Sequence, residues 1–170
     1  MKKHIFLTGD IQVGKSTAIR KALAMLGCSV GGFRTSGTNY QADGSSDVVI
    51  YAASASPESG YRVAHRSATT GISVYPEIFD EFGTYYLQQP GTILLMDELG
   101  YMESKALKFQ EAVFAALDGT TPVLGVIRNR DTPFLNIVRK RDDVIVLTVT
   151  EANRDIIPNK ISYFFKNLLQ

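Results

Sequence analysis

The stretch Gly9-Asp10-Ile11-Gln12-Val13-Gly14-Lys15-Ser16-Thr17 decides the fold of this chain of 170 residues. It has the form G-x-x-x-x-G-K-S-T, follows the apolar run Ile5-Phe6-Leu7 and precedes an amphipathic stretch, Ala18–Leu26. A strand, a glycine-rich turn and a helix in this order are the context in which the pattern forms a phosphate-binding loop, the P-loop. We therefore expect these nine residues to surround the phosphates of a nucleotide.

The residue types in this loop each suit a different part of a nucleotide. Gly9 and Gly14 allow backbone turns that a Cβ would obstruct, so successive N–H groups can point at phosphate oxygens. A helix that begins near Lys15 adds its positive dipole end. We expect Lys15 to reach the β- and γ-phosphates, Ser16 to bind Mg²⁺ through its hydroxyl, and Thr17 to support the α-phosphate.

The overall composition is that of one globular domain spanning residues 1–170. The net charge of +1 gives no basic face for nucleic acid, and no apolar run approaches the roughly 20 residues of a membrane span. We expect a cytoplasmic protein with no nucleic-acid or membrane partner. The single cysteine, Cys28, is expected to be a buried small hydrophobe, and neither His4 nor His65 has neighbours at metal-ligand spacing.

Strands and helices alternate along most of the chain, which predicts an α/β fold with a mostly parallel central sheet flanked by helices. Short apolar runs predict the strands, at 3–8, 29–35, 92–96, 122–127 and 144–149. Helical periodicity predicts helices at 15–26, 74–88, 104–117, 133–139 and 161–169, with the aromatic side chains of 74–88 in the core.

Residues 36–73 differ in composition from the rest of the chain. They are rich in Gly, Ser, Ala and Thr, with short β-like runs at 48–51 and 61–65. This pattern predicts a β-rich excursion, with hairpins attached to the edge of the sheet.

An acidic pair, Asp97-Glu98, directly follows the apolar run Thr92–Met96. In open α/β sheets, ligands bind at the carboxyl ends of the strands, so this pair should lie beside the P-loop. Asp97 is then expected to hold Mg²⁺, and Glu98 to orient or deprotonate the attacking water. A pair of solvated carboxylates is the alternative that the sequence leaves open.

Four arginines follow predicted strands and so belong near the same edge. Arg34 either supplies positive charge near the γ-phosphate or pairs with a nearby acid. Arg128 and Arg130 either clamp phosphates, form a small lid, or stay solvated. Arg154, in Asn153-Arg154-Asp155, is expected to contact base or ribose, with helix capping by Asn153 as the competing explanation.

Together, four segments resemble the thermophile-type nucleoside-triphosphatase family, which includes the cancer-related nucleoside-triphosphatase. They are the P-loop, Gly32-Phe33-Arg34-Thr35, the run Asp97-Glu98-Leu99-Gly100-Tyr101-Met102-Glu103 with Phe109 and Val113 behind it, and Asn153-Arg154-Asp155. The resemblance spans roughly residues 3–159 and is weakest over 36–73. It implies a RecA-like or kinase-like P-loop fold and slow Mg²⁺-dependent hydrolysis of several nucleoside triphosphates. Ile11, Gln12, Tyr101 and Ser104 depart from the family pattern; none of these departures removes a phosphate or magnesium ligand, and the first two leave the exact loop shape open.

The sequence therefore predicts an enzyme that hydrolyses ATP, GTP and other nucleoside triphosphates, with Lys15, Glu98 and Arg34 as catalytic residues. Broad base preference is expected because Asn159-Lys160-Ile161-Ser162 lacks the carboxylate that reads guanine. Two alternatives use the same loop: a small-molecule or nucleotide kinase whose 36–73 segment holds an acceptor, and a nucleotide-dependent switch for a protein partner whose identity the sequence leaves unknown.

Overall fold

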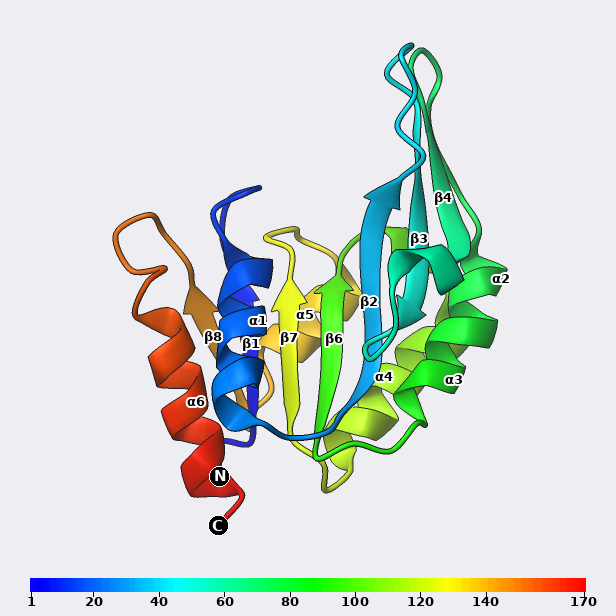
Figure 1. Cartoon of the computed structure of the whole chain (residues 1–170). Helices are drawn as coiled ribbons and strands as arrows, with labels where there is room; N and C mark the ends of the chain where they lie inside the picture. Colours follow the sequence, from blue (N-terminus) through cyan, green and yellow to red (C-terminus); the bar gives the residue numbers. More distant parts are fainter.

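Parallel strands form one half of an eight-stranded sheet in the computed structural model, which describes residues 1–170 (Figure 1). The parallel half has the order β2-β6-β7-β1-β8, and its pairs run β2–β6, β6–β7, β7–β1 and β1–β8. The predicted α/β fold with a mostly parallel sheet is confirmed. The strands are β1 (His4–Thr8), β2 (Val30–Thr38), β6 (Ile93–Leu99), β7 (Val123–Ile127) and β8 (Val144–Thr148).

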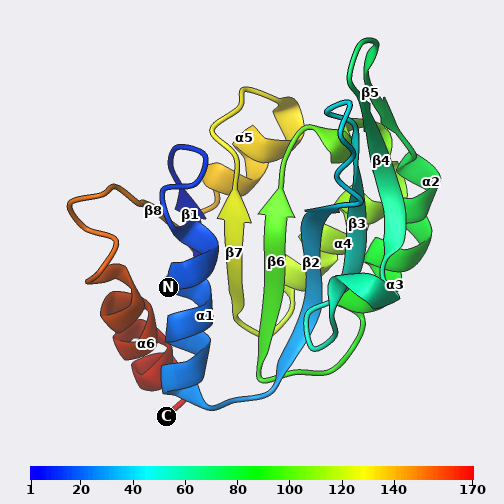
Figure 2. The ribbon, with the colours of Figure 1, turned by 45° about the horizontal axis from the view of Figure 1, so that its top comes forward.

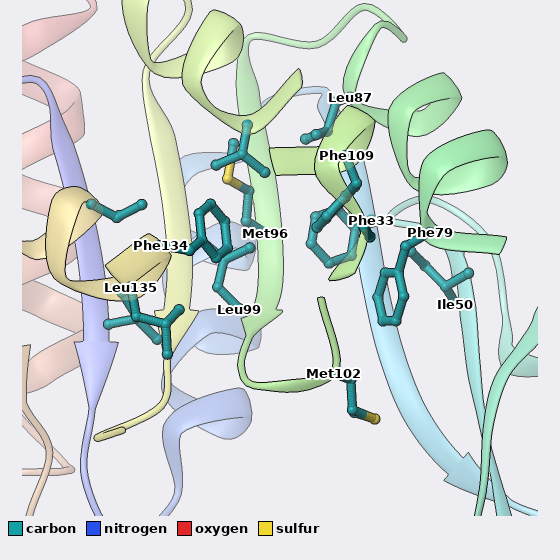
Figure 3. Packing of buried hydrophobic residues seen from close by; sticks show 14 of the residues in the cluster. Phe33, Ile50, Phe79, Leu87, Met96, Leu99, Met102, Phe109, Phe134 and Leu135 are labelled. Atoms are coloured by element: carbon teal, nitrogen blue, oxygen red, sulfur yellow. The ribbon is translucent and has the colours of Figure 1, made fainter. Parts of the chain in front are cut away.

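Helices cover both faces of this half, and each strand sends alternate side chains to each face. In β1, Ile5 and Leu7 pack in one core layer with α1 (Lys15–Leu26) and α6 (Ile157–Leu168). Phe6 points the other way, into the layer of α4 (Leu107–Asp118) and α5 (Pro133–Arg139). Figure 3 shows this second layer, where the Phe33 and Phe109 rings meet edge to face at 5.4 Å. Burial on both faces explains why these strands are continuously apolar.

The remaining strands form an antiparallel extension of the sheet. They are β3 (Ser46–Ala52), β4 (Tyr61–Ser67) and β5 (Gly71–Val74), added beyond β2 in the order β5-β4-β3-β2. We call residues 36–74 the arm. It projects past the carboxyl ends of the parallel strands (Figures 1 and 2). The predicted edge hairpins are confirmed, and β2 is longer than predicted because it pairs with β3 as far as Thr38.

The predicted helix at 74–88 is interrupted and begins later. Val74 belongs to β5, and the helical segment starts at Pro76 as α2 (Pro76–Ile78), continues as a π-helical turn (Phe79–Gly83) and ends as α3 (Thr84–Leu87). Gly83 lies directly against the Phe109 ring, where a Cβ would approach Cδ2 to 2.6 Å. The prediction that this segment's aromatic side chains belong to the core is confirmed for Phe79 and Tyr86 and wrong for Tyr85, which is 56% exposed.

Other boundaries differ where tertiary contacts extend or shorten an element. β6 continues to Leu99, so Asp97 and Glu98 lie inside the strand and not after it, because β2 pairs with it as far as Asp97 and β7 as far as Leu99. The predicted helix at 104–117 begins instead as a 3₁₀ turn, Met102–Lys105, followed by α4. Helix α6 starts at Ile157, four residues before the predicted start, with Pro158 in its first turn.

His4 and Cys28 have structural surroundings. His4 is fully buried; its Nδ1 accepts the Val123 N–H at 2.9 Å and its Nε2 lies 3.0 Å from the Leu117 carbonyl oxygen. Burial lowers its pKa to about 4, so the ring is neutral and ties β1 to β7 and α4. Cys28 is half-buried against the α1 core layer, not fully buried as expected, and burial raises its pKa. None of the helices is both long and apolar enough to cross a membrane.

Candidate functional site

The loop between β1 and α1 takes a shape that only some residues permit. Gly9 has φ 143° and Gly14 has φ 111°, and a Cβ on Gly9 would lie 2.5 Å from the Val149 carbonyl oxygen. Gln12 is also left-handed, with φ 61°. This conformation costs a residue with a side chain about 1 kcal/mol. Gln12 therefore fits the loop at the cost of some backbone strain. Ile11 is 79% exposed and points away from the core.

A polar cavity of ≈ 590 Å³ lies over this loop. The loop and the ends of β6 and β7 supply its walls, and Ile11 is the one hydrophobic residue among them. The lining residues are Gly9, Asp10, Ile11, Gln12, Gly14, Lys15, Ser16, Thr17, Glu98, Arg128, Asn129 and Arg130. The structure thus brings most of the predicted site residues into one hollow. The Val13 side chain, in contrast, is buried in the core, so only its backbone is available to a ligand.

The Lys15 ammonium is folded back over the loop. Its Nζ donates to the carbonyl oxygens of Gly9 and Asp10, at 2.8 and 2.6 Å. Partial burial lowers its pKa, although the nearby Glu98 carboxylate opposes that shift. The ammonium therefore lies within the cavity wall and needs only a change of side-chain rotamer to meet an anion above the loop.

Asp97 lies beside the cavity and has few partners of its own. It is 7% exposed, its Oδ2 is 3.5 Å from the Ser16 Oγ, and Arg34 Nη1 lies 3.6 Å from the same oxygen. Burial raises the pKa of this carboxyl to about 6, and Arg34 opposes that shift only in part. Of the two expectations for Arg34, the structure places it beside an acid, on a strand next to the cavity and not in the cavity lining.

Glu98 points into the cavity and is paired with an arginine. Its Oε1 accepts from Arg128 Nε at 2.6 Å. The strand tip behind it is held by Thr35 of β2, whose hydroxyl donates to the Asp97 carbonyl oxygen at 3.3 Å and accepts the Glu98 N–H at 3.4 Å. Strand β2 therefore positions both acids of the pair, which explains why the sheet continues past the apolar run.

Sequence reasoning gave no role to Glu103, which is 1% exposed under the turn after β6. Both of its carboxylate oxygens accept the Gly100 N–H, at 3.1 and 3.0 Å. Burial raises its pKa to about 7. The spacing Gly100-x-x-Glu103 was the available signal, because a turn N–H is often satisfied by an acid three residues later.

The loop from β7 to α5 forms the far wall of the cavity. Arg130 stacks over the Tyr101 ring, with its guanidinium carbon 4.5 Å from the ring centroid. Asn129, between the two arginines, also lines the cavity but had no predicted role. Arg139 of α5, likewise overlooked, donates to the backbone carbonyl oxygens of Arg128 and Arg130.

Arg154 is not among the residues that line the cavity, although it lies beside Gly14, which is. Its Cδ is 3.5 Å from where a Cβ of Gly14 would stand, so its side chain runs along the start of α1. Asn153 does not cap α6 as the competing explanation required. Its side chain closes the turn after β8, accepting the Thr150 N–H at 2.8 Å and donating to the Thr148 carbonyl oxygen at 2.9 Å.

Comparison with known proteins places this geometry in context. A family model described as NTPase matches residues 4–162. The nucleoside-triphosphatase THEP1 of Natranaerobius thermophilus is 29% identical over 95% of both chains, and that of Methanosarcina barkeri is 29% identical over 97% of this chain and 98% of its own.

Two solved structures share the fold. The crystal structure of THEP1 from Aquifex aeolicus superposes with a TM-score of 0.78 at 22% identity, covering 96% of this chain and 99% of that one. The solution structure of a human cancer-related nucleoside triphosphatase gives a TM-score of 0.73 at 27% identity, covering 97% and 98%.

Proposed function

This chain belongs to the NTPase family, and on that premise we propose that it hydrolyses nucleoside 5′-triphosphates, ATP and GTP among them, to the diphosphate and phosphate with the help of Mg²⁺. The observation that supports this most directly is the shared cavity. The phosphate-binding loop and the Glu98 carboxylate face the same polar hollow, so a phosphate bound on the loop would lie beside a general base.

The residues at the edge of that hollow fit a magnesium ion. Mg²⁺ prefers oxygen ligands and binds through one or two carboxylates, with water and substrate phosphates in the remaining positions. Ser16 and Asp97 supply a hydroxyl and a carboxylate oxygen 3.5 Å apart, and the carboxylate accepts no shorter hydrogen bond. These two residues would hold the ion, which would neutralise charge on the phosphates.

The loop would bind the triphosphate by charge and by backbone N–H groups. Lys15 would exchange its two carbonyl partners for the β- and γ-phosphate oxygens. The remaining loop residues and Thr17 would surround the other phosphate oxygens, and the amino end of α1 adds its dipole. Arg154, alongside Gly14, would contact base or ribose without reading the base edge, in keeping with a broad preference.

Glu98 would act on the water that attacks the γ-phosphate. In the free protein its carboxylate is paired with Arg128. When the γ-phosphate enters, Arg128 has a second anion within the same cavity, and sharing the arginine would leave Glu98 able to accept a proton from water. Arg34, held by Asp97, would add positive charge from the neighbouring strand.

Phosphate release from ATP, GTP, CTP and UTP with Mg²⁺ tests this proposal. We expect turnover of several nucleotides, lost in Lys15→Ala and in Glu98→Gln, while Glu98→Gln still binds nucleotide. Lys140→Ala and Glu111→Gln remove the same charges from exposed positions, directly after α5 and on α4, and serve as matched controls. Tight binding without phosphate release would refute hydrolysis and favour a kinase or a switch. Unchanged turnover in Glu98→Gln would refute the role of Glu98 alone.

A further inference from the structure

Hydrogen bonds hold both ends of the β7–α5 loop, residues 128–132, in place. The Arg128 N–H pairs with the Leu99 carbonyl oxygen at 2.9 Å, and the Arg130 N–H turns back to the Arg128 carbonyl oxygen at 2.8 Å. Thr132 then caps α5 by accepting the Leu135 N–H at 3.2 Å. The backbone from Arg128 to Thr132 is therefore fixed at both ends, so the arginines that it presents start from one defined geometry.

One side chain of α5 holds the middle of this loop. The Arg139 guanidinium donates through Nη1 to the Arg130 carbonyl oxygen at 2.8 Å and through Nη2 to the Arg128 carbonyl oxygen. Nη1 also reaches the Asn136 side-chain oxygen at 3.0 Å, and the Asn136 amide in turn donates to Asp131. A planar guanidinium can span two carbonyls on either side of one residue, which a lysine ammonium cannot do with the same geometry.

Arg139 does this without a carboxylate partner. No ion pair is formed by its guanidinium, although burial of the side chain disfavours its charge and lowers its pKa. A partly buried cation that lacks an ion pair is a costly way to stabilise a loop. Arg141, two residues later, is stabilised in the usual way for a partly buried arginine, by ion pairs with Asp118 and Asp143 at 2.8 Å each.

The side chains that this loop presents are also fixed from the opposite wall. Arg128 lies against Gly100, with its Cδ 3.4 Å from where a Cβ of Gly100 would stand, and ends on Glu98. Arg130 lies over the Tyr101 ring. The loop backbone and the Arg128 and Arg130 side chains are thus held in place on the side of the cavity that faces the P-loop. We call these two arginines and their backbone the clamp.

We infer that Arg139 is a positioning residue that fixes the Arg128–Arg130 backbone so that both arginines meet the γ-phosphate of a bound triphosphate, an inference that rests on the proposed function. Arg139 does not touch the phosphate in this scheme. It acts only through Arg128 and Arg130, and this gives the inference a sharp consequence: its removal should matter only while those arginines are present.

The test is a double-mutant cycle with Arg139→Ala, Arg128→Ala/Arg130→Ala and the combination of all three, measured by kcat, KM and melting temperature. We expect Arg139→Ala to lower kcat about tenfold, within the coupling range of residues in one hydrogen-bond network, and to change little when Arg128 and Arg130 are already absent. Added guanidinium ion should restore part of kcat in Arg139→Ala but not in the triple variant.

Arg141→Ala is the matched control, since it removes an equally placed arginine that does not contact the loop. A merely structural Arg139 would behave like Arg141, with a lower melting temperature and unchanged kcat at a temperature where both variants are folded. That result, or independent losses in the triple variant, would overturn the inference.

Binding separates this inference from the proposed function. If the wild-type chain releases no phosphate, hydrolysis fails, and the affinities of a non-hydrolysable ATP analogue and of ADP then decide about Arg139. A fall in the ratio of analogue to ADP affinity in Arg139→Ala supports the clamp, because only the analogue has a γ-phosphate. An unchanged ratio overturns it.

Discussion

Asp97 in the parallel half and Asp47 in the arm are alike in two quantities, the exposed fraction of the residue and the distance to an arginine. Each is 7% exposed, and each has an arginine Nη1 at 3.6 Å, from Arg34 and Arg62 respectively. Yet their pKa values shift in opposite directions. Burial raises the pKa of Asp97 to about 6, whereas that of Asp47 is lowered, chiefly by a hydrogen bond from Asn39.

Desolvation by burial dominates at Asp97, whereas hydrogen bonds outweigh it at Asp47. Both oxygens of Asp47 are occupied: Oδ2 accepts from Asn39 Nδ2 at 2.9 Å and Oδ1 lies 2.7 Å from His65 Nδ1. Asp97 has only the Ser16 hydroxyl, at 3.5 Å. A buried carboxylate that is fully hydrogen-bonded stabilises the fold around it. One that is left short of partners is available to a ligand, so deeper burial together with missing hydrogen bonds separates Asp97 in the candidate site from Asp47 in the arm.

The largest expected difference is in turnover. Asp97→Asn should lower kcat by about 100-fold or more, because a preset negative charge for the metal is lost. Asp47→Asn should leave kcat within about twofold, since loss of a hydrogen-bond network in the arm does not reach the reacting groups. Phosphate release at saturating ATP and Mg²⁺ measures both. Equal losses in the two variants would show that the arm takes part in the reaction.

The two arginines extend the same comparison at a smaller scale. Arg34→Ala should lower kcat about tenfold, less than the roughly 100-fold or more of a donor that touches the reacting group, because Arg34 acts from the neighbouring strand. Arg62→Ala should not change it, because Arg62 is largely exposed and contacts Asp47 and the Tyr75 ring, neither of which lines the cavity. The measurement is kcat at saturating nucleotide. An unaffected Arg34→Ala enzyme would reduce Arg34 to a structural partner of Asp97.

The free energy of unfolding should respond in the opposite order, with the larger loss in Asp47→Asn and little or none in Asp97→Asn. Asp47→Asn should lower the free energy of unfolding by about 1–3 kcal/mol, because an amide N–H₂ would face the donors that the carboxylate satisfied. Asp97→Asn keeps the shape and removes a buried, poorly partnered charge, so the free energy of unfolding should stay equal or rise. Urea denaturation at pH 8 without Mg²⁺ compares them. A clear loss in Asp97→Asn would mean that its partners satisfy the charge after all.

The smallest effect is the pH dependence of stability without metal. A raised folded-state pKa means that the native state holds its proton more tightly than the unfolded chain, so Asp97 costs stability as pH rises from about 4 to about 6. Glu103 extends that loss to about pH 7. Asp47, whose pKa is lowered, contributes stability that is lost as pH falls below about 4.

Denaturation curves across this pH range check the signs. Asp97→Asn should remove the decline between about pH 4 and 6, and Glu103→Gln the part that continues to about pH 7, whereas Asp47→Asn should change only the acid side. A wild-type chain whose stability rises steadily from pH 5 to pH 7 would contradict both raised pKa values. Mg²⁺ should reduce the decline that Asp97 causes, since a bound cation favours the ionised carboxylate.

Prediction from the sequence succeeded where a local pattern implies one geometry. The glycine spacing of the P-loop and the apolar runs of β1, β6 and β7 allow few alternatives, because a buried parallel strand must be apolar on both faces. The predicted helix at 74–88 starts too early, because periodicity cannot show that Val74 pairs with Ala64 in the sheet. Periodicity also cannot show that Gly83, in the π-helical turn, lies against the Phe109 ring. Glu103 and Arg139 stayed unnoticed because their partners are backbone groups, which no side-chain pattern records.

By itself the sequence determined the glycine-rich loop between β1 and α1, the α/β class of the fold and the identity of the acids and arginines near the strand ends. Those properties depend on residue type and on spacing within a few positions. The tertiary structure alone decided which of these groups meet: Glu98 with Arg128, Asp97 with Arg34 and Ser16, and Arg139 with the β7–α5 loop. The physical reason is that pairing and hydrogen bonding act at distances of a few ångströms, and only the folded sheet brings residues this far apart in the chain to that range.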